Sequence, residues 1–301
     1  FFIIRNLLFL GLLVAGAGYY LKAVIRPDMG LAGKLSGFGN PFADRFVKNY
    51  GSQDAEQTRA EKRARTLAPL LGVVFFLIST LLAFDWMMSI DQEWFSTIFG
   101  VQYAVANLAG AAAALMIISG IARKHFHLDE YITIDRYNDL SRLTFVLCAL
   151  WTYLIFSQVL IIWYGNLSEE TPYLILRMQS LEWGWMFWLI FILMVIIPFF
   201  GLLSRAACRS IRFSRLVAAD ILLGLWLEKY FLVVPSIQEN NASAGIIDAS
   251  NGLPGFSLNF YDVSITLGVL GVFLLSYLWF LQRVPVVPIS DPLLVRMKDE
   301  G

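Results

Sequence analysis

The sequence predicts an all-α, polytopic membrane protein, and its composition and apolar segments both support this class. Of the 301 residues, 58% are hydrophobic, only 15% are charged, and the mean hydropathy is +0.64. A soluble domain normally carries about 25% charged residues. Apolar windows of the roughly 20 residues needed to cross a bilayer recur along the chain. The formal net charge is zero, so charge gives no indication of a nucleic acid or any other partner.

Seven windows are long and apolar enough to be predicted as transmembrane helices. They cover residues 1–25, 66–90, 96–121, 141–164, 181–203, 213–236 and 260–283. The chain opens inside an apolar run, at Phe1-Phe2-Ile3-Ile4, without an initiator Met or the charged n-region of a signal peptide. We therefore expect further helices upstream. We expect one transmembrane domain over 1–290, which includes a long loop at 26–65, and a tail at 291–301.

Lys and Arg are distributed unevenly among the connections between these windows. Loop 26–65 contains eight of them, loops 122–142 and 204–215 contain four each, and the alternate connections contain only Arg177. Cytoplasmic loops of membrane proteins are enriched in Lys and Arg. This pattern predicts that the basic loops and the C-terminus are cytoplasmic. Within the first basic loop, the charged stretch from Ser52 to Arg65 indicates a solvated helix.

The predicted spans lack the ligands of the common redox cofactors. The only histidines are His125 and His127, which lie in a loop, whereas a transmembrane b-type haem usually takes two His ligands from facing helices. The two cysteines, Cys148 and Cys208, have no iron–sulfur or metal-like spacing and are expected to be packing residues. We therefore expect no haem, iron–sulfur cluster or metal in this chain.

Seven spans also raise the receptor and retinal-protein classes. The tripeptide Asp135-Arg136-Tyr137 resembles a receptor motif but lies in a polar loop, well past the third span. The last span, 260–283, contains neither the Asn-Pro-x-x-Tyr motif of receptors nor the Lys that would bind retinal. The sequence therefore disfavours both classes.

Polar side chains within the spans suggest two kinds of site, since such groups are costly in lipid and usually face a bundle interior or a ligand. Candidates for binding a quinol head group near the outer face are Asp85, Glu93, Glu182 and Tyr103. Candidates for a proton path are Asp220 and Glu228, with Tyr153, Ser157 and Gln158 lining it. The two path carboxylates are about 12 Å apart along one helix and about 80° apart around it, so they could border one interior face.

A structural role for the same residues remains open. Carboxylates near an interface cost little, and Glu228 could pair with Lys229. Trp183 and Trp185 fit an aromatic belt, and Pro198 is expected to kink the fifth span.

Two stretches resemble a known family of membrane subunits. Phe84-Asp85-Trp86-Met87-Met88-Ser89, followed by Trp94-Phe95-Ser96-Thr97-Ile98-Phe99-Gly100, is similar to one signature of that family. The run Tyr153-Leu154-Ile155-Phe156-Ser157-Gln158 with Ile161-Ile162-Trp163-Tyr164-Gly165-Asn166-Leu167 and Glu169-Glu170 is similar to a second. The family is the NrfD/polysulfide-reductase-type membrane subunits of alternative complex III, a bacterial quinol oxidoreductase, and the resemblance covers roughly residues 26 to 290.

The resemblance implies a ten-helix protein with two four-helix bundles, of which this chain would supply the C-terminal seven spans. It implies a place in the bacterial inner membrane, in a respiratory or photosynthetic complex. Implied partners are a homologous NrfD-like membrane subunit, an iron–sulfur subunit and multihaem cytochrome c subunits; the implied ligand is a quinone such as menaquinone.

Two departures from the family pattern bear on this expectation. Members often have Pro-His where this chain has Gln92-Glu93, and Pro where it has Ser168. Loss of that His would weaken a quinol site and favour a proton path or a scaffold.

We therefore expect a non-autonomous subunit of a quinol:electron acceptor oxidoreductase that supports quinol oxidation, proton conduction or both. The alternative is a purely structural membrane anchor for the peripheral iron–sulfur and haem subunits. An independent ion-coupled transporter is a third class, which the resemblance disfavours.

Overall fold

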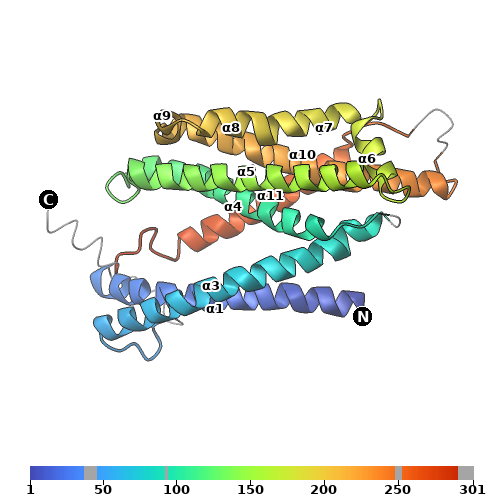
Figure 1. Cartoon of the computed structure of the whole chain (residues 1–301). Coiled ribbons are helices and arrows are strands. Elements are labelled where there is room, and N and C mark those ends of the chain that lie inside the picture. Colours follow the sequence, from blue (N-terminus) through green and yellow to red (C-terminus); the bar gives the residue numbers. More distant parts are fainter. Residues whose placement is uncertain (37–45, 92–93, 248–252, 291–301) are drawn as a thin grey trace. The chain divides into compact units, whose positions relative to one another are not determined.

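The computed structural model describes residues 1–36, 46–91, 94–247 and 253–290, and every regular element in these ranges is a helix (Figure 1). These helices confirm the all-α prediction. Among the residues selected from the sequence, Glu93 lies outside the described part of the chain, and so does the predicted tail 291–301.

Within the described residues, six helices are long and apolar enough to cross a membrane. They are α1 (Phe2–Ser36), α3 (Gln53–Trp86), α4 (Thr97–His125), α5 (Ile134–Gly165), the run from α7 (Gly184–Phe191) to α8 (Ile197–Leu202), and α11 (Phe260–Leu281). They correspond to six of the seven predicted windows, and the chain is a multi-pass membrane protein by this criterion. The remaining window, 213–236, lies within α10, Ile211–Ser243. That helix carries Asp220, Glu228 and Lys229 in its apolar stretch.

The described chain forms two units. Unit 1 comprises residues 1–75 and the segment from 258 onward, and unit 2 comprises residues 76–257. Unit 1 contains α1 (Phe2–Ser36), the first part of α3 (Gln53–Trp86) and α11 (Phe260–Leu281). A small core in this unit joins Met29 to Val284.

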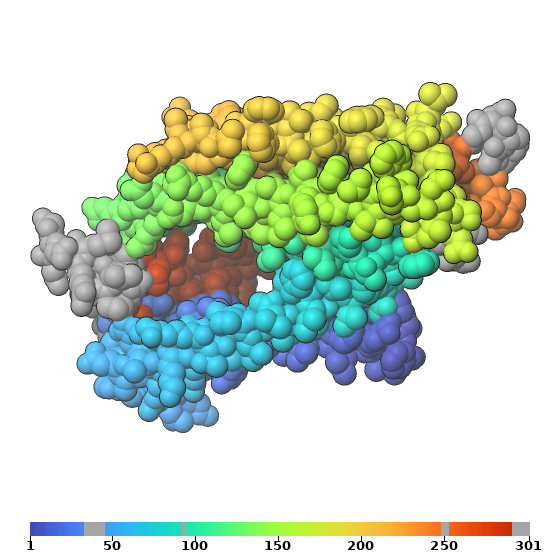
Figure 2. All heavy atoms as spheres, in the orientation of Figure 1, coloured from blue at the N-terminus to red at the C-terminus, as the bar shows by residue number. Residues whose placement is uncertain are grey.

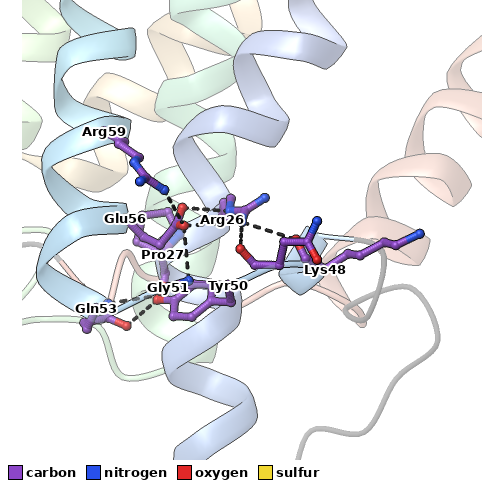
Figure 3. A network of polar contacts seen from close by, with 9 residues as sticks. Arg26, Pro27, Lys48, Tyr50, Gly51, Gln53, Glu56 and Arg59 are labelled. Carbon is purple, nitrogen blue, oxygen red and sulfur yellow. Dashed lines mark hydrogen bonds and ion pairs between the residues drawn. The ribbon is translucent and has the colours of Figure 1, made fainter.

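A polar network in unit 1 ties the end of α1 to the start of α3 (Figure 3). Nε of Arg26 donates to Oε2 of Glu56 at 2.8 Å, and Nη1 of Arg59 donates to Oε1 of Glu56 at 3.1 Å. The Tyr50 hydroxyl bonds to the side chain of Gln53 and donates to the carbonyl of Pro27 at 3.3 Å. The charged first turns of α3 confirm the helix expected between Ser52 and Arg65.

Unit 2 is a helical bundle built on α4 (Thr97–His125), α5 (Ile134–Gly165) and α10. Helix α4 contacts both of the others and presents small residues to them, Ala106, Ala109 and Ala113 among them, each almost fully buried. Small residues let helix backbones approach closely in a membrane protein. Both cysteines are buried in this core, as expected.

The fifth predicted span consists of α7 (Gly184–Phe191), a π-helix η2 (Ile192–Ile196) and α8 (Ile197–Leu202). Pro198 lies in the first turn of α8, so the predicted irregularity takes the form of a π-helical turn just before the proline. Figure 2 shows the side chains of α5 against those of the η2–α8 part of this span, on one face of unit 2.

Among the residues that the structure describes, the connections between the longer helices include the short helices η1 (Met88–Ile90), α6 (Thr171–Met178) and α9 (Arg205–Arg209). Helix α6 was not predicted from the sequence. It contacts α5, α7 and α10 and buries Tyr173 and Arg177. Burial raises the pKa of the Cys208 thiol in α9, which keeps this cysteine in its protonated form at neutral pH.

Candidate functional site

A cavity of about 740 Å³ lies within unit 2, between α5 and the α7–η2–α8 span. Residues of α4, α10 and α6 complete its wall. Most lining side chains are apolar, and the aromatic ones are Phe99, Phe145, Trp151, Tyr153, Phe156, Tyr173, Phe187, Trp188, Phe191, Phe199 and Phe231.

The cavity wall includes side chains at the outer surface of the unit. Tyr153 is 63% exposed, Phe156 62% and Trp188 57%. These side chains lie on helices that are long and apolar enough to cross a membrane, so this part of the rim is open to an apolar surrounding. The cavity therefore suits a flat, lipid-soluble molecule that enters from the bilayer.

Glu228 of α10 is the acidic group on this wall and is only 3% exposed. Its Oε1 accepts hydrogen bonds from Nε2 of Gln102 at 3.2 Å and Nε1 of Trp151 at 3.0 Å. Its Oε2 accepts one from Nζ of Lys229 at 2.9 Å. A single carboxylate thus joins α4, α5 and α10.

The groups around Glu228 all donate hydrogen bonds to it, since Trp Nε1 and Lys Nζ can only donate. Its two oxygens offer about four acceptor positions, and three of them are used. One acceptor position of Glu228 is therefore left. The ammonium group of Lys229, 4.2 Å from the ring centroid of Tyr103, balances its charge.

Arg177 of α6 is the basic group on the same wall and is 3% exposed. Its Nη1 donates to the carbonyl of Tyr173 at 3.3 Å, and its Nη2 donates to the carbonyl of Leu232 at 3.2 Å and to Oγ of Ser236 at 2.6 Å. The guanidinium carbon lies 3.6 Å from the ring centroid of Tyr173. Oγ of Ser236 in turn donates to Oδ2 of Asp91 at 3.3 Å.

The three predicted path-lining residues of α5 are placed differently from one another. Gln158 is 8% exposed and lines the cavity, and its Oε1 is buried without a hydrogen-bond partner. Tyr153 also lines the cavity, from its exposed rim. Ser157 is not part of the wall: its hydroxyl donates to the carbonyl of Tyr153, one turn earlier in the same helix, at 2.8 Å.

The predicted quinol-binding residues do not gather at the cavity. Tyr103 lies next to it, beneath Lys229. Asp85, near the end of α3, and Glu182, just before α7, are half-buried and are not among the residues of the wall. Glu93 lies outside the described residues.

Asp220 lies two turns before Glu228 on α10 but does not share its cavity. It borders a separate pocket of about 380 Å³ with Phe200, Phe213 and Leu216. Its Oδ2 is buried without a hydrogen-bond partner. The described structure therefore does not join the two predicted path carboxylates through one cavity.

Gln102, Trp151 and Arg177 complete the site, although none of them was among the selected candidates. Gln102 had the same signal as those candidates, because it is a polar residue inside the span 96–121. Arg177 had one signal: it is the only basic residue in the three connections poor in Lys and Arg. Within the described ranges, no three His, Cys, Asp or Glu side chains gather as a metal ion would require.

Comparison with known proteins adds no family assignment. No protein-family model matches the chain, and no curated protein matches it.

Proposed function

We propose that this protein is a membrane subunit of a quinol-oxidising electron-transfer complex and that the cavity of unit 2 receives the quinol. The observation that carries the proposal is the placement of Glu228, a buried carboxylate on the wall of an aromatic cavity whose rim includes surface residues. The sequence resemblance to membrane subunits of alternative complex III supports the same class.

The chemistry follows from the donors around Glu228. Oxidation of a quinol to a quinone releases two protons and two electrons. The carboxylate of Glu228 accepts one proton from a quinol hydroxyl, and Lys229, Gln102 and Trp151 hold it in position. The second proton passes to water outside the cavity, and iron–sulfur or haem centres of partner subunits would take up the two electrons. The aromatic wall keeps water away from the ring, which strengthens the hydrogen bonds to its oxygens.

The second candidate is a structural anchor for peripheral redox subunits, and one observation favours it. Glu228 is paired with Lys229, and a paired carboxylate can serve simply to join helices. A proton path through Asp220 and Glu228 has less support, because the two side chains border different pockets.

The test is quinol-driven electron transfer and proton release in the assembled complex carrying Glu228→Gln. Gln keeps the size of the side chain but is a far weaker base. We expect turnover to fall by about 100-fold or more, a typical contribution of a positioned base. Asp220→Asn is the matched control, since it alters a carboxylate of the same helix outside the cavity, and we expect near-normal turnover. Normal turnover of the Glu228→Gln complex, with assembly intact, would leave the anchor as the better account.

A further inference from the structure

Arg177 has more hydrogen-bonding capacity than its neighbours use. A guanidinium carries five N–H donors. Three hydrogen bonds are formed, all to uncharged oxygens, and Nε is buried without a partner. Among the described residues, no carboxylate lies within ion-pair distance of Arg177. A buried charge is costly unless it is paired and hydrogen-bonded. The described part of the chain therefore leaves the guanidinium of Arg177 without a directly bonded anionic partner.

The hydrogen bond between Arg177 and α10 shows where Arg177 lies relative to Glu228. The guanidinium bonds to the carbonyl of Leu232, which lies four residues beyond Glu228 on that helix. Four residues correspond to about 6 Å of helical rise. Both side chains line the same cavity. One wall of the cavity therefore carries a hydrogen-bond acceptor and, about one helical turn further along, a charged donor.

The orientation of the guanidinium is fixed from two sides. Its central carbon lies 3.6 Å from the ring centroid of Tyr173, and that ring stacks on Trp94 with centroids 3.8 Å apart and an interplanar angle of 6°. Ser236 and Leu232 hold its edge. A planar, preorganised donor of this kind suits an oxygen that carries partial or full negative charge.

We infer that Arg177 is the second anchor of the cavity ligand and binds the ring oxygen opposite the hydroxyl whose proton Glu228 accepts. The inference rests on the proposed function and specifies the ligand further: an aromatic ring with two oxygens at opposite positions and an apolar tail. Oxidation of such a ring places partial negative charge on both oxygens, because each becomes a carbonyl oxygen. Arg177 therefore acts as a positioning and charge-stabilising group, while Glu228 takes the proton.

The test measures equilibrium binding of an alkyl-hydroquinone to the assembled complex in nanodiscs under anaerobic conditions. Trp151 and Trp188 lie in the cavity wall, so quenching of tryptophan fluorescence reports binding. We expect Arg177→Met to weaken binding by about 10- to 100-fold, as expected for a lost hydrogen bond to a charged group. Arg209→Met is the matched control, because Arg209 lies in α9 and pairs with Asp135.

A second ligand makes the test independent of the variant's folding. A phenol with the same alkyl tail retains one hydroxyl and lacks the opposite oxygen. In the wild type we expect it to bind about 10- to 100-fold more weakly than the hydroquinone. In Arg177→Met the two ligands should bind about equally.

The outcomes separate the two proposals. Saturable hydroquinone binding that is unchanged in Arg177→Met, or a wild type that binds phenol and hydroquinone equally, overturns the role of Arg177 and leaves the proposed function standing. Loss of a copurifying anionic phospholipid from Arg177→Met, with hydroquinone affinity unchanged, also overturns it and assigns the guanidinium to a lipid phosphate. A wild type without saturable binding overturns both proposals.

Discussion

The indole Nε1 of Trp151 donates a hydrogen bond of 3.0 Å to Oε1 of Glu228, which joins α5 to α10 in the interior of unit 2. Both side chains are almost fully buried. Because Gln102 of α4 donates to the same oxygen, the carboxylate stabilises the bundle as well as facing the cavity. Substitutions here must therefore be judged by stability as well as by activity.

Trp151→Phe removes the indole donor and keeps an aromatic ring. We expect it to lower the free energy of unfolding by about 1.5 to 3 kcal/mol, the range for a hydrogen bond to a charged group. Thermal unfolding in detergent measures the loss. Trp188→Phe is the control, since Trp188 also lines the cavity but is 57% exposed. An equal shift for both variants would contradict a specific role for the Trp151 hydrogen bond.

Lys229→Met leaves the carboxylate of Glu228 buried without its cation. We expect a loss of about 1.5 to 3 kcal/mol, because the buried carboxylate loses a hydrogen bond from a charged donor that is itself only partly buried. In the double variant Glu228→Gln/Lys229→Met that charge is gone, and stability should recover in part. A double-mutant cycle of unfolding free energies measures the coupling. Additive effects of the two substitutions would show that the pair is not coupled.

Gly100 of α4 allows α3 to pack closely. A Cβ at this position would overlap Cγ2 of Thr80 and lie 3.0 Å from Cζ of Phe84. We expect Gly100→Ala to cost about 1 to 3 kcal/mol through overpacking, measured as a lower melting temperature. Gly72→Ala is the control: a Cβ there meets nothing within 4 Å, so it should be tolerated. An unchanged melting temperature for Gly100→Ala would show that the contact is loose.

Glu56 lies in the charged first turns of α3, before the predicted apolar span, and its stabilising effect should depend on pH. Burial opposes its ionisation, but hydrogen bonds from Arg26 and the Gly51 N–H outweigh this, and the pKa of Glu56 is lowered from its ordinary 4.5. A lowered folded-state pKa contributes stability above the unfolded value that is lost as the pH falls.

At pH 7 the melting temperature of the wild type should therefore exceed that of Glu56→Gln. This difference in melting temperature should disappear as the pH falls below about 4.5. Glu61→Gln is the control, because Glu61 is half exposed and its ion pair with Arg65 spans 3.9 Å. A difference in melting temperature that stayed constant with pH would show that the ionised carboxylate of Glu56 is not its cause.

Much of the fold could be predicted from the sequence because the signal for a spanning helix is strong and local. An apolar run of about 20 residues requires a helix in lipid, since every backbone polar group must find an internal partner. The short helix α6 was missed because eight residues carry too little periodicity. Its stability comes from buried Tyr173 and Arg177, which contact residues distant in the sequence.

Only part of the candidate site could be predicted, because the sequence does not show which way each side chain of a helix faces. Glu228, Gln158 and Tyr153 were selected as polar residues inside spans, and all three line the cavity. Ser157, adjacent to Gln158, bonds to its own helix instead. Trp183 was expected in an aromatic belt but is fully buried, because the turn before α7 directs it into the core.

The π-helical turn at Ile192–Ile196 gives the fifth span one residue more than an uninterrupted α-helix would need. Each residue of an α-helix adds about 100° of rotation. The π turn absorbs the extra residue, so the α-helical segments on either side of it keep the register of an uninterrupted helix. Without the π turn, the extra residue would rotate everything beyond it by about that angle. Phe199 would then leave the cavity wall, and Gly201 would lose its close approach to Val217. The number of residues in this span, as much as their hydrophobicity, decides which of them the cavity contains.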